Sequence, residues 1–278
     1  MLLLALACVG TDPGDGTPHD SVDSESLGPQ PPTPAAYAGT CPAFGDKTDF
    51  ESAGYTRKVL VRLPADPVGA PVWFNWHWLG GSANQGLRYQ ELELATDAGF
   101  IVIAPDSRDD EPFEWPFVEG DDPTPDLQLF DDLLSCLHET YQVDLNRVHS
   151  TGMSAGGLWT TYLLMNRSTV LASAAPLSGG TQPFQPYTTP ERDLPVLITW
   201  GGPSDLYNGL SFALASTDLS EALIEDGHSV AHCVHDDGHN LPPGGTEYTI
   251  RFFQDHPWGT ETVSLNGDAY PDFCGMPQ

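Results

Sequence analysis

A serine flanked by glycines is the feature of this sequence with the clearest potential for chemistry. Ser154 lies in the segment 147–157, R-V-H-S-T-G-M-S-A-G-G, with Gly152 and Gly156 two residues to either side. A β-prone run precedes it, and apolar residues at helical spacing follow in 158–164, so we expect a strand, a sharp turn and a helix. A serine at the apex of such a turn needs small neighbours, because a Cβ at either glycine would collide with the adjacent strand or helix. The helix N-terminus would then stabilise negative charge beside the hydroxyl, although G-x-S-x-G also occurs by chance.

A serine hydroxyl is a weak nucleophile near pH 7, so it needs a histidine base that is itself oriented by a carboxylate. Where the serine lies at such a turn, the acid and then the histidine follow it, each in a loop after a later strand. The expected strand 195–200 leads into G-G-P-S-D, which ends at Asp205. The expected strand 229–234 leads into H-D-D-G-H, which ends at His239. We therefore predict Ser154, His239 and Asp205 as nucleophile, base and orienting acid.

Other histidines and acids are less well placed. His235 is the main rival base, but it lies at the end of its expected strand, where a half-buried structural role is more usual. The remaining candidates precede a strand, lie within one or are too close to His239 to orient it: His228, His232, Asp193, Asp236 and Asp237.

Acyl transfer also needs two N–H donors for the oxyanion. The first is expected from Ala155, the residue after the nucleophile. The second should come from the turn 77–81, H-W-L-G-G, most simply from Trp78 or Leu79. His77 itself is expected to hold this turn rather than to carry protons.

Aromatic residues near these segments are candidates for substrate contacts. The loop 108–125 is rich in Asp, Glu, Pro and aromatic residues, and a loop of this kind over the carboxyl end of a sheet often determines specificity. We predict Trp78 and Trp115 as substrate-binding residues. Trp159 on the nucleophile helix and Trp76 at a strand end are expected in the core instead.

The elements that must position these residues alternate between strand and helix. The expected strands are 58–63 at an edge, 71–76, 100–104, 148–151, 172–178, 195–200 and 229–234, and the expected helices include 91–98, 127–141 and 246–255. Such alternation indicates parallel βαβ units. We predict an α/β fold with a mostly parallel central sheet and helices on both faces.

Four blocks of sequence resemble a known group of proteins in their order and spacing. They are H-W-L-G-G-S-A (77–83), G-F-I-V-I-A-P-D (99–106), N-R-V-H-S-T-G-M-S-A-G-G (146–157) and D-G-H-N-L-P (237–242). Together they resemble the secreted polyhydroxybutyrate depolymerase and feruloyl or acetylxylan esterase group of α/β-hydrolases, over about residues 41–256. The resemblance implies the α/β-hydrolase fold and Ser154, Asp205 and His239 as the triad. The chain departs from it in having His77-Trp78 where the group usually has His-Gly, which leaves the second oxyanion donor open.

These observations predict a serine carboxylesterase that hydrolyses ester bonds through an acyl-enzyme. The expected substrates, polymer-linked or small, are feruloyl or acetyl esters of plant polysaccharide or polyhydroxyalkanoate-type polyesters. The alternative is a catalytically silent binding lipoprotein with the hydrolase fold, which predicts a broken triad. A peptide-cleaving hydrolase is disfavoured, because nothing in the sequence indicates a propeller or a deep charged pocket. No cofactor is expected, and no cysteine pair has metal-ligand spacing.

The N-terminus indicates an exported protein, and the net charge restricts its partners. The chain has 278 residues, with 10 Lys and Arg against 39 Asp and Glu and a net charge of −29, which argues against nucleic acid or an anionic membrane surface as a partner. Residues 1–8 resemble the end of a bacterial lipoprotein signal in which Cys8 is lipidated, the alternative being a stub of an ordinary secretory signal. Residues 9–40 read as a flexible acidic tether and 41–278 as one catalytic domain. We expect a monomer, either extracellular or held at the outer membrane or cell surface by that lipid.

Four further cysteines, Cys41, Cys136, Cys233 and Cys274, are an even number in a chain that we expect to be exported. Two disulfides are therefore plausible, and the sequence does not choose among the three pairings. Cys41 and Cys274 lie at the two ends of the expected domain, where a bridge would tie down the termini.

Overall fold

A nine-stranded sheet forms the centre of the computed structural model, which describes residues 29–277. The expected signal segment 1–8, with Cys8, and the tether as far as residue 28 lie outside the described residues. In sheet order the strands are β1 (Thr48–Ser52), β2 (Tyr55–Arg62), β4 (Ile101–Pro105), β3 (Val72–Trp76), β5 (Val148–Met153), β6 (Ser173–Leu177), β7 (Val196–Trp200), β10 (Val230–Val234) and β11 (Cys274–Gly275). The strands from β4 to β10 are parallel, and β1, β2 and β11 run antiparallel to their neighbours. The predicted mostly parallel α/β fold is confirmed.

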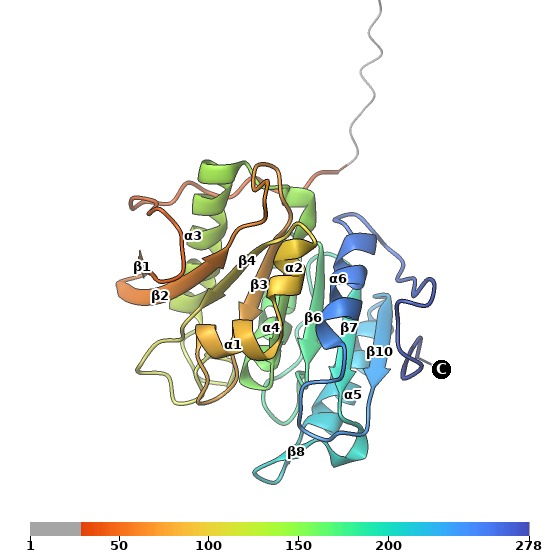
Figure 1. Ribbon diagram of the computed structural model, residues 1–278. Coiled ribbons are helices and arrows are strands. Elements are labelled where there is room, and N and C mark those ends of the chain that lie inside the picture. Colours follow the sequence, from red (N-terminus) through yellow and green to blue (C-terminus); the bar gives the residue numbers. More distant parts are fainter. Residues whose placement is uncertain (1–28, 278) are drawn as a thin grey trace, which may run out of the picture.

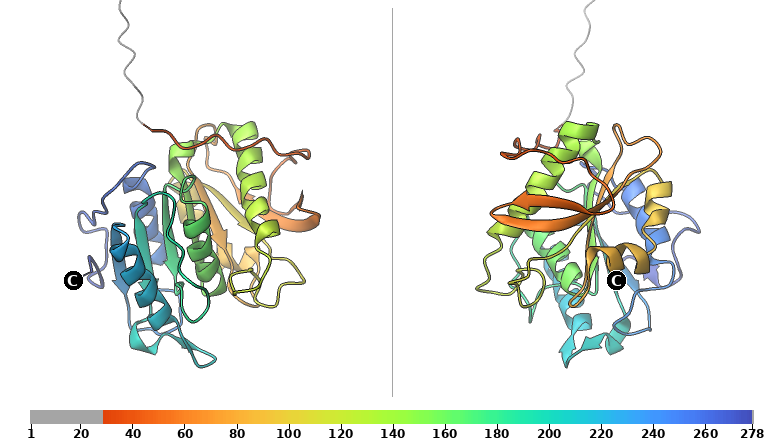
Figure 2. Two further views of the ribbon diagram at one scale, coloured as in Figure 1. Left: turned by 180° about the vertical axis from the view of Figure 1, so that it is seen from behind. Right: turned by 60° about the vertical axis from the view of Figure 1, so that its left-hand side comes forward.

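Helices cover both faces of this sheet. The helices are α1 (Ala83–Tyr89), α2 (Glu93–Asp97), α3 (Thr124–Tyr141), α4 (Ala155–Asn166), α5 (Phe212–Glu225) and α6 (Gly245–Asp255), with short 3₁₀ turns η1 (Leu145–Arg147) and η2 (Gly202–Ser204). Helices α1, α2 and α6 lie on the face turned to the viewer in Figure 1, and α3, α4 and α5 lie on the face seen from behind in Figure 2. Each face has its own buried apolar cluster. Because the inner strands are covered on both sides, they read as continuous apolar runs in the sequence.

The structure corrects the predicted edge of the sheet. The segment predicted as an edge strand, 58–63, belongs to β2, which lies between β1 and β4. Strand β1, T-D-F-E-S, was missed because its alternating polar residues give a weak signal, although Ala53-Gly54 makes a tight hairpin to β2. Helices α1 and α5 were also missed. Helix α1 is capped by Ser82, whose hydroxyl accepts a hydrogen bond from the Gln85 N–H, a helix-start signal that the sequence did contain.

Two disulfides tie terminal segments to the nearest elements rather than to each other. Cys41 bonds Cys136 on α3, and Cys233 on β10 bonds Cys274 on β11. The bridge between Cys41 and Cys274 that the sequence suggested is therefore not formed. Cys41 lies beside α3, whereas Cys274 lies beside β10. Within residues 29–277, no helix is both long and apolar enough to cross a membrane.

A buried histidine on β5 makes the stability of the fold depend on pH. His149 on β5 is fully buried, its Nδ1 is 2.9 Å from the Ser173 hydroxyl, and its ring stacks on Phe253 at 4.5 Å. Burial lowers its pKa well below the ordinary value, so the folded protein holds this ring neutral.

We expect acid to destabilise the protein through this residue. In the unfolded chain His149 binds a proton as the pH falls through about 6.5, whereas the folded chain does not, so the stability present above that pH declines below it. The slope for one such proton is about 1.4 kcal/mol per pH unit. Urea unfolding between pH 8 and pH 5 checks this. His149→Gln should show a shallower fall than the wild type below pH 6.5, and parallel curves would contradict the prediction.

Candidate active site

Ser154 lies at a strained turn between β5 and α4. Its φ of 57° and ψ of −119° are unusual for a residue with a side chain. A Cβ at Gly152 would come within 2.5 Å of the Gly156 carbonyl oxygen and 2.6 Å of that of Trp76. A Cβ at Gly156 would overlap the same Trp76 carbonyl and approach the His77 oxygen to 2.8 Å. Both glycines are therefore required for the helix to start this close to β3, as the sequence pattern indicated.

Three side chains from separate loops form one hydrogen-bonded chain at the carboxyl end of the sheet. His239 Nε2 lies 2.9 Å from Ser154 Oγ, and His239 Nδ1 lies 2.6 Å from Asp205 Oδ1. Because the Asp205 carboxylate can only accept, Nδ1 carries the proton and Nε2 is left to accept from the Ser154 hydroxyl. Asp205 is fully buried, and the His239 side chain keeps 11% of its surface exposed. This arrangement suits removal of the serine proton and stabilisation of the imidazolium that results.

The environment of Asp205 keeps it ionised. Burial alone would raise the pKa of this carboxyl, but hydrogen bonds from His239, from the Gly201 N–H at 2.9 Å and from the Ser178 hydroxyl at 2.7 Å outweigh that effect and lower it. Ser178, directly after β6, was not predicted from sequence. The only signal for it in the sequence was the position of a serine at the end of β6, the strand next to β7.

The rival histidines and acids lie elsewhere. His235 is almost fully buried; burial lowers its pKa, and its Nδ1 accepts from the Asp237 N–H. His232 is bonded to the Ser220 hydroxyl. The structure pairs His228 with Leu194 N–H and Asp193, and it leaves Asp236 exposed. None of these side chains hydrogen-bonds to Ser154 or His239.

The predicted oxyanion donors border Ser154. Ala155 is the first residue of α4, where backbone N–H groups have no acceptor within the helix. Trp78 and Leu79 follow β3, and both line the hollow that contains Ser154 and His239. Within residues 29–277, neither the Trp78 N–H nor the Leu79 N–H has a protein acceptor.

Two hollows of different character meet at Ser154. One of about 130 Å³ is almost wholly apolar and is lined by Leu79, Phe113, Phe117, Val118, Ser154, Ala155, Leu158, Phe184, Tyr207, Asn208, Leu210 and Phe212. The other, about 600 Å³ and more polar, is lined by Trp78, Leu79, Tyr89, Met153, Ser154, Tyr207, His239, Asn240 and Leu241. Leu79, Ser154 and Tyr207 border both. A substrate bound across this junction would have one apolar end enclosed and the other in the wider opening.

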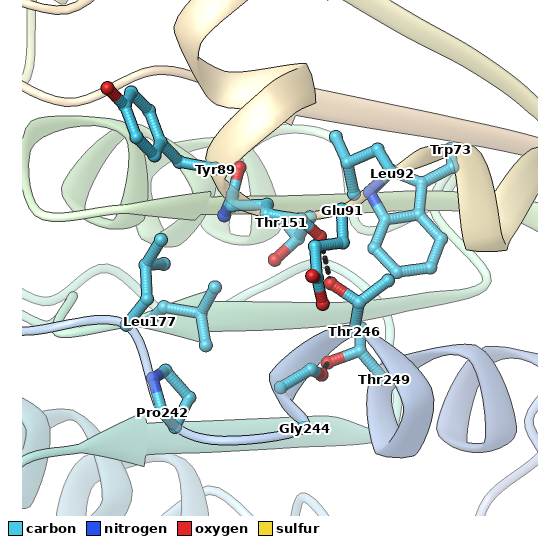
Figure 3. A pocket seen from close by; sticks show the side chains of 13 residues that line it. Trp73, Tyr89, Glu91, Leu92, Thr151, Leu177, Pro242, Gly244, Thr246 and Thr249 are labelled. Carbon is cyan, nitrogen blue, oxygen red and sulfur yellow. Dashed lines mark hydrogen bonds between the residues drawn. The ribbon is translucent and has the colours of Figure 1, made fainter.

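Figure 3 shows a third, smaller cavity. It shares Tyr89 and Leu241 with the lining of the wider hollow, but none of the three catalytic side chains lines it. It holds about 50 Å³ between the α1–α2 connection and the start of α6. Two of its buried polar atoms, Gln90 Oε1 and Trp73 Nε1, have no protein partner among the described residues, and the Thr246 hydroxyl donates to the Gln90 carbonyl. A polar cavity of this size suits a few water molecules rather than a substrate.

The tryptophan predictions have mixed outcomes. Trp78 is half-buried and lines the wider hollow with Tyr89, whose ring centroid is 5.9 Å away. The prediction that Trp115 binds substrate is wrong, because its side chain is 0% exposed and packs under the turn after β3. Trp76 and Trp159 lie in the core, as expected.

The sequence did not lead us to predict the residues that line the apolar hollow on the side nearest Asp205. A hairpin of β8 (Leu206–Tyr207) and β9 (Leu210–Ser211) follows Asp205 directly and projects beyond the sheet in Figure 1. The Tyr207 ring lies 5.4 Å from the His239 ring, and the Phe212 ring lies 4.3 Å from it. The dipeptide Asn208-Gly209, a strong hairpin signal, could have revealed this element. Across residues 29–277, no group of three or more His, Cys, Asp or Glu is arranged to hold a metal ion.

Known proteins resemble this chain in sequence and fold. Residues 86–235 match the model of the prolyl oligopeptidase family. The oxidized polyvinyl alcohol hydrolase of Sphingopyxis sp. (strain 113P3) is 26% identical over 313 residues, which cover 86% of each protein. The putative esterase NocK of Nocardia uniformis subsp. tsuyamanensis is 25% identical over 236 residues, covering 78% of this chain and 66% of that one. The crystal structure of native sOPH shares the fold, with a TM-score of 0.69, 20% identity and coverage of 88% of this chain and 97% of that one.

Proposed function

The chain belongs to the prolyl oligopeptidase family of α/β-hydrolases, and from that premise we propose that it is a serine carboxylesterase acting through Ser154, His239 and Asp205. A hydrolase and an esterase among the named relatives support the hydrolase class. The observation that carries the proposal is the continuous hydrogen-bonded chain from Ser154 to Asp205, placed where an apolar hollow meets an open one.

The reaction has two acyl-transfer steps. Ser154 Oγ attacks the ester carbonyl while His239 Nε2 takes its proton, and Asp205 stabilises the imidazolium. The Ala155 N–H and a donor from Trp78 or Leu79 bind the oxyanion. Collapse breaks the ester C–O bond, and the departing alcohol takes the proton from His239. Water then gives a proton to His239, attacks the acyl carbon and releases the acid, with the proton returning to Ser154.

The linings of the two hollows favour a substrate whose acyl group is uncharged. The smaller one is lined by phenylalanine and leucine side chains, so a charged acyl group would lose its hydration there without gaining a partner. The wider one, with Trp78 and Tyr89, has room for a large alcohol component such as a polymer segment. We propose esters of this kind as substrates: feruloyl or acetyl groups on plant polysaccharide, or polyhydroxyalkanoate-type polyesters. Peptide cleavage is disfavoured, because no Lys, Arg, Asp or Glu lines either hollow in the described chain.

An exported location is also part of the proposal. Two disulfides support an oxidising compartment, which agrees with the lipoprotein-like start of the sequence. The catalytically silent binding lipoprotein is not favoured, because the hydrogen-bonded chain is unbroken.

A fluorophosphonate probe and a substrate panel test the proposal. We expect the probe to add one phosphonyl group, located by peptide mass spectrometry on Ser154. We expect p-nitrophenyl acetate, butyrate and octanoate to be hydrolysed, and an alanyl-prolyl p-nitroanilide to be left intact. Four further substrates then distinguish the polymer classes: ethyl ferulate, acetylated xylan, a short-chain polyhydroxyalkanoate and oxidized polyvinyl alcohol. The last is the substrate in the name of the Sphingopyxis relative. A protein that neither reacts with the probe nor hydrolyses any ester would refute the proposal.

A further inference from the structure

The two peptide units before the candidate oxyanion donors have both of their carbonyl groups held by the protein. The Trp115 Nε1–H donates to the His77 carbonyl at 2.8 Å. The Trp78 carbonyl accepts from His77 Nδ1 at 3.0 Å and from the Gly81 N–H at 2.9 Å. All these groups belong to the turn after β3 or to the loop that packs beneath it.

Holding a carbonyl also sets the direction of the N–H in the same peptide unit. Both peptide bonds are trans, so the N–H points opposite to the C=O. The bond from Trp115 to the His77 oxygen therefore directs the Trp78 N–H away from the core, and the bonds to the Trp78 oxygen direct the Leu79 N–H in the same manner. Both residues line the hollow that contains Ser154, and neither N–H group has a protein acceptor among the described residues.

The loop after β4 supplies the remaining anchors of the turn. The Ser107 N–H donates to His77 Nε2 at 3.1 Å, which places the His77 proton on Nδ1, where it reaches the Trp78 carbonyl. Burial lowers the pKa of His77, in keeping with a neutral ring that accepts at one nitrogen and donates at the other. The Glu114 carboxylate accepts from the Gly80 N–H at 2.9 Å and from the Ser107 hydroxyl.

We infer that Trp115 is a positioning residue for the oxyanion hole, and that its indole N–H holds the His77 carbonyl so that the N–H groups of the turn face the cleft. The inference rests on the proposed esterase function. Trp115 touches no substrate, because it is fully buried. By holding the oxyanion donors in place, Trp115 stabilises the charge that develops on the substrate oxygen. It therefore lowers the free energy of the transition state more than that of the bound substrate.

A nearby tryptophan provides a matched control. Trp159 on α4 is equally buried, and its ring is nearly parallel to that of Trp115 at 6.4 Å. Its Nε1–H has no hydrogen-bond partner among the described residues. Trp115→Phe and Trp159→Phe therefore remove similar volumes from one cluster, but only the first removes a hydrogen bond to the turn.

We expect Trp115→Phe to lower kcat for p-nitrophenyl butyrate by about tenfold or more, with KM changed less than about twofold. Its affinity for a trifluoromethyl ketone, whose adduct with Ser154 carries an oxyanion, should weaken by the same factor as kcat/KM. Trp159→Phe should stay near the wild type in both measurements. Glu114→Ala removes the half-buried carboxylate that accepts from the Gly80 N–H, so it should also lower kcat. It serves as the test variant if Trp115→Phe does not fold.

The outcomes separate this inference from the proposed function. Equal kcat and equal ketone affinity in Trp115→Phe and Trp159→Phe, or a Trp115→Phe defect confined to KM or to thermal stability, would overturn the inference while the wild type still hydrolyses esters. An inactive wild type would instead overturn the proposed function.

Discussion

Ser154→Ala is expected to lower kcat/KM for p-nitrophenyl butyrate by at least about 10⁴-fold, because removing a triad nucleophile leaves only the oxyanion donors and substrate binding. Ser154 Oγ is the oxygen that lies within hydrogen-bond distance of His239 Nε2 in the described structure. The neighbouring hydroxyl of Ser178 is directed to Asp205 Oδ2 instead and cannot replace it. Steady-state kinetics checks the loss, and labelling by the fluorophosphonate probe should disappear with it.

The loss should occur without unfolding. Alanine removes only the hydroxyl of Ser154, and the Ser154 N–H keeps its hydrogen bond to the Leu177 carbonyl. We therefore expect the thermal midpoint to stay within about 2 °C of the wild type, since a substitution that opens no cavity changes stability little. A folded Ser154→Ala protein that retains more than about one hundredth of the activity would point to a different nucleophile.

The sequence was most informative where a backbone constraint requires a particular residue. Gly152 and Gly156 indicated the turn at Ser154, because the close approach of α4 to β3 leaves no room for a Cβ at either position. The ends of two inner strands, recognisable as apolar runs, indicated where Asp205 and His239 would lie. These signals are local, and the parallel sheet converts them into proximity, because its strands end at one edge.

Contacts decided by tertiary packing could not be predicted in this way. The alternation of aromatic residues around Trp115 reads equally well as an exposed loop, and only the three-dimensional structure shows its indole donating to a carbonyl 38 residues away. The disulfide pairing likewise depends on which elements adjoin each terminus. The apolar hollow combines Phe113, Phe184 and Phe212 from three separate loops or helices, so no short pattern marks it.

The loops that carry the acid and the base touch through glycines. A Cβ at Gly201 would overlap the Gly238 carbonyl and lie 2.7 Å from the Gly238 Cα. These are backbone atoms, so the loop bearing His239 would have to move. Alanine would keep the N–H that donates to Asp205 at 2.9 Å, and the substitution therefore tests loop position rather than the loss of a hydrogen bond.

We expect Gly201→Ala to lower kcat/KM by about 10²-fold, the effect of displacing a catalytic group by roughly 1 Å. His239 is in hydrogen-bond contact with Ser154 and Asp205 at once, so a shift of its loop cannot preserve both contacts. Overpacking should also cost about 1–3 kcal/mol of unfolding free energy, measured in urea. Gly45→Ala is the matched control, since no atom lies within 4 Å of its added Cβ, and it should match the wild type. Full activity in Gly201→Ala would mean that the two loops can separate without losing the alignment of His239, and the contact between them would then have no part in catalysis.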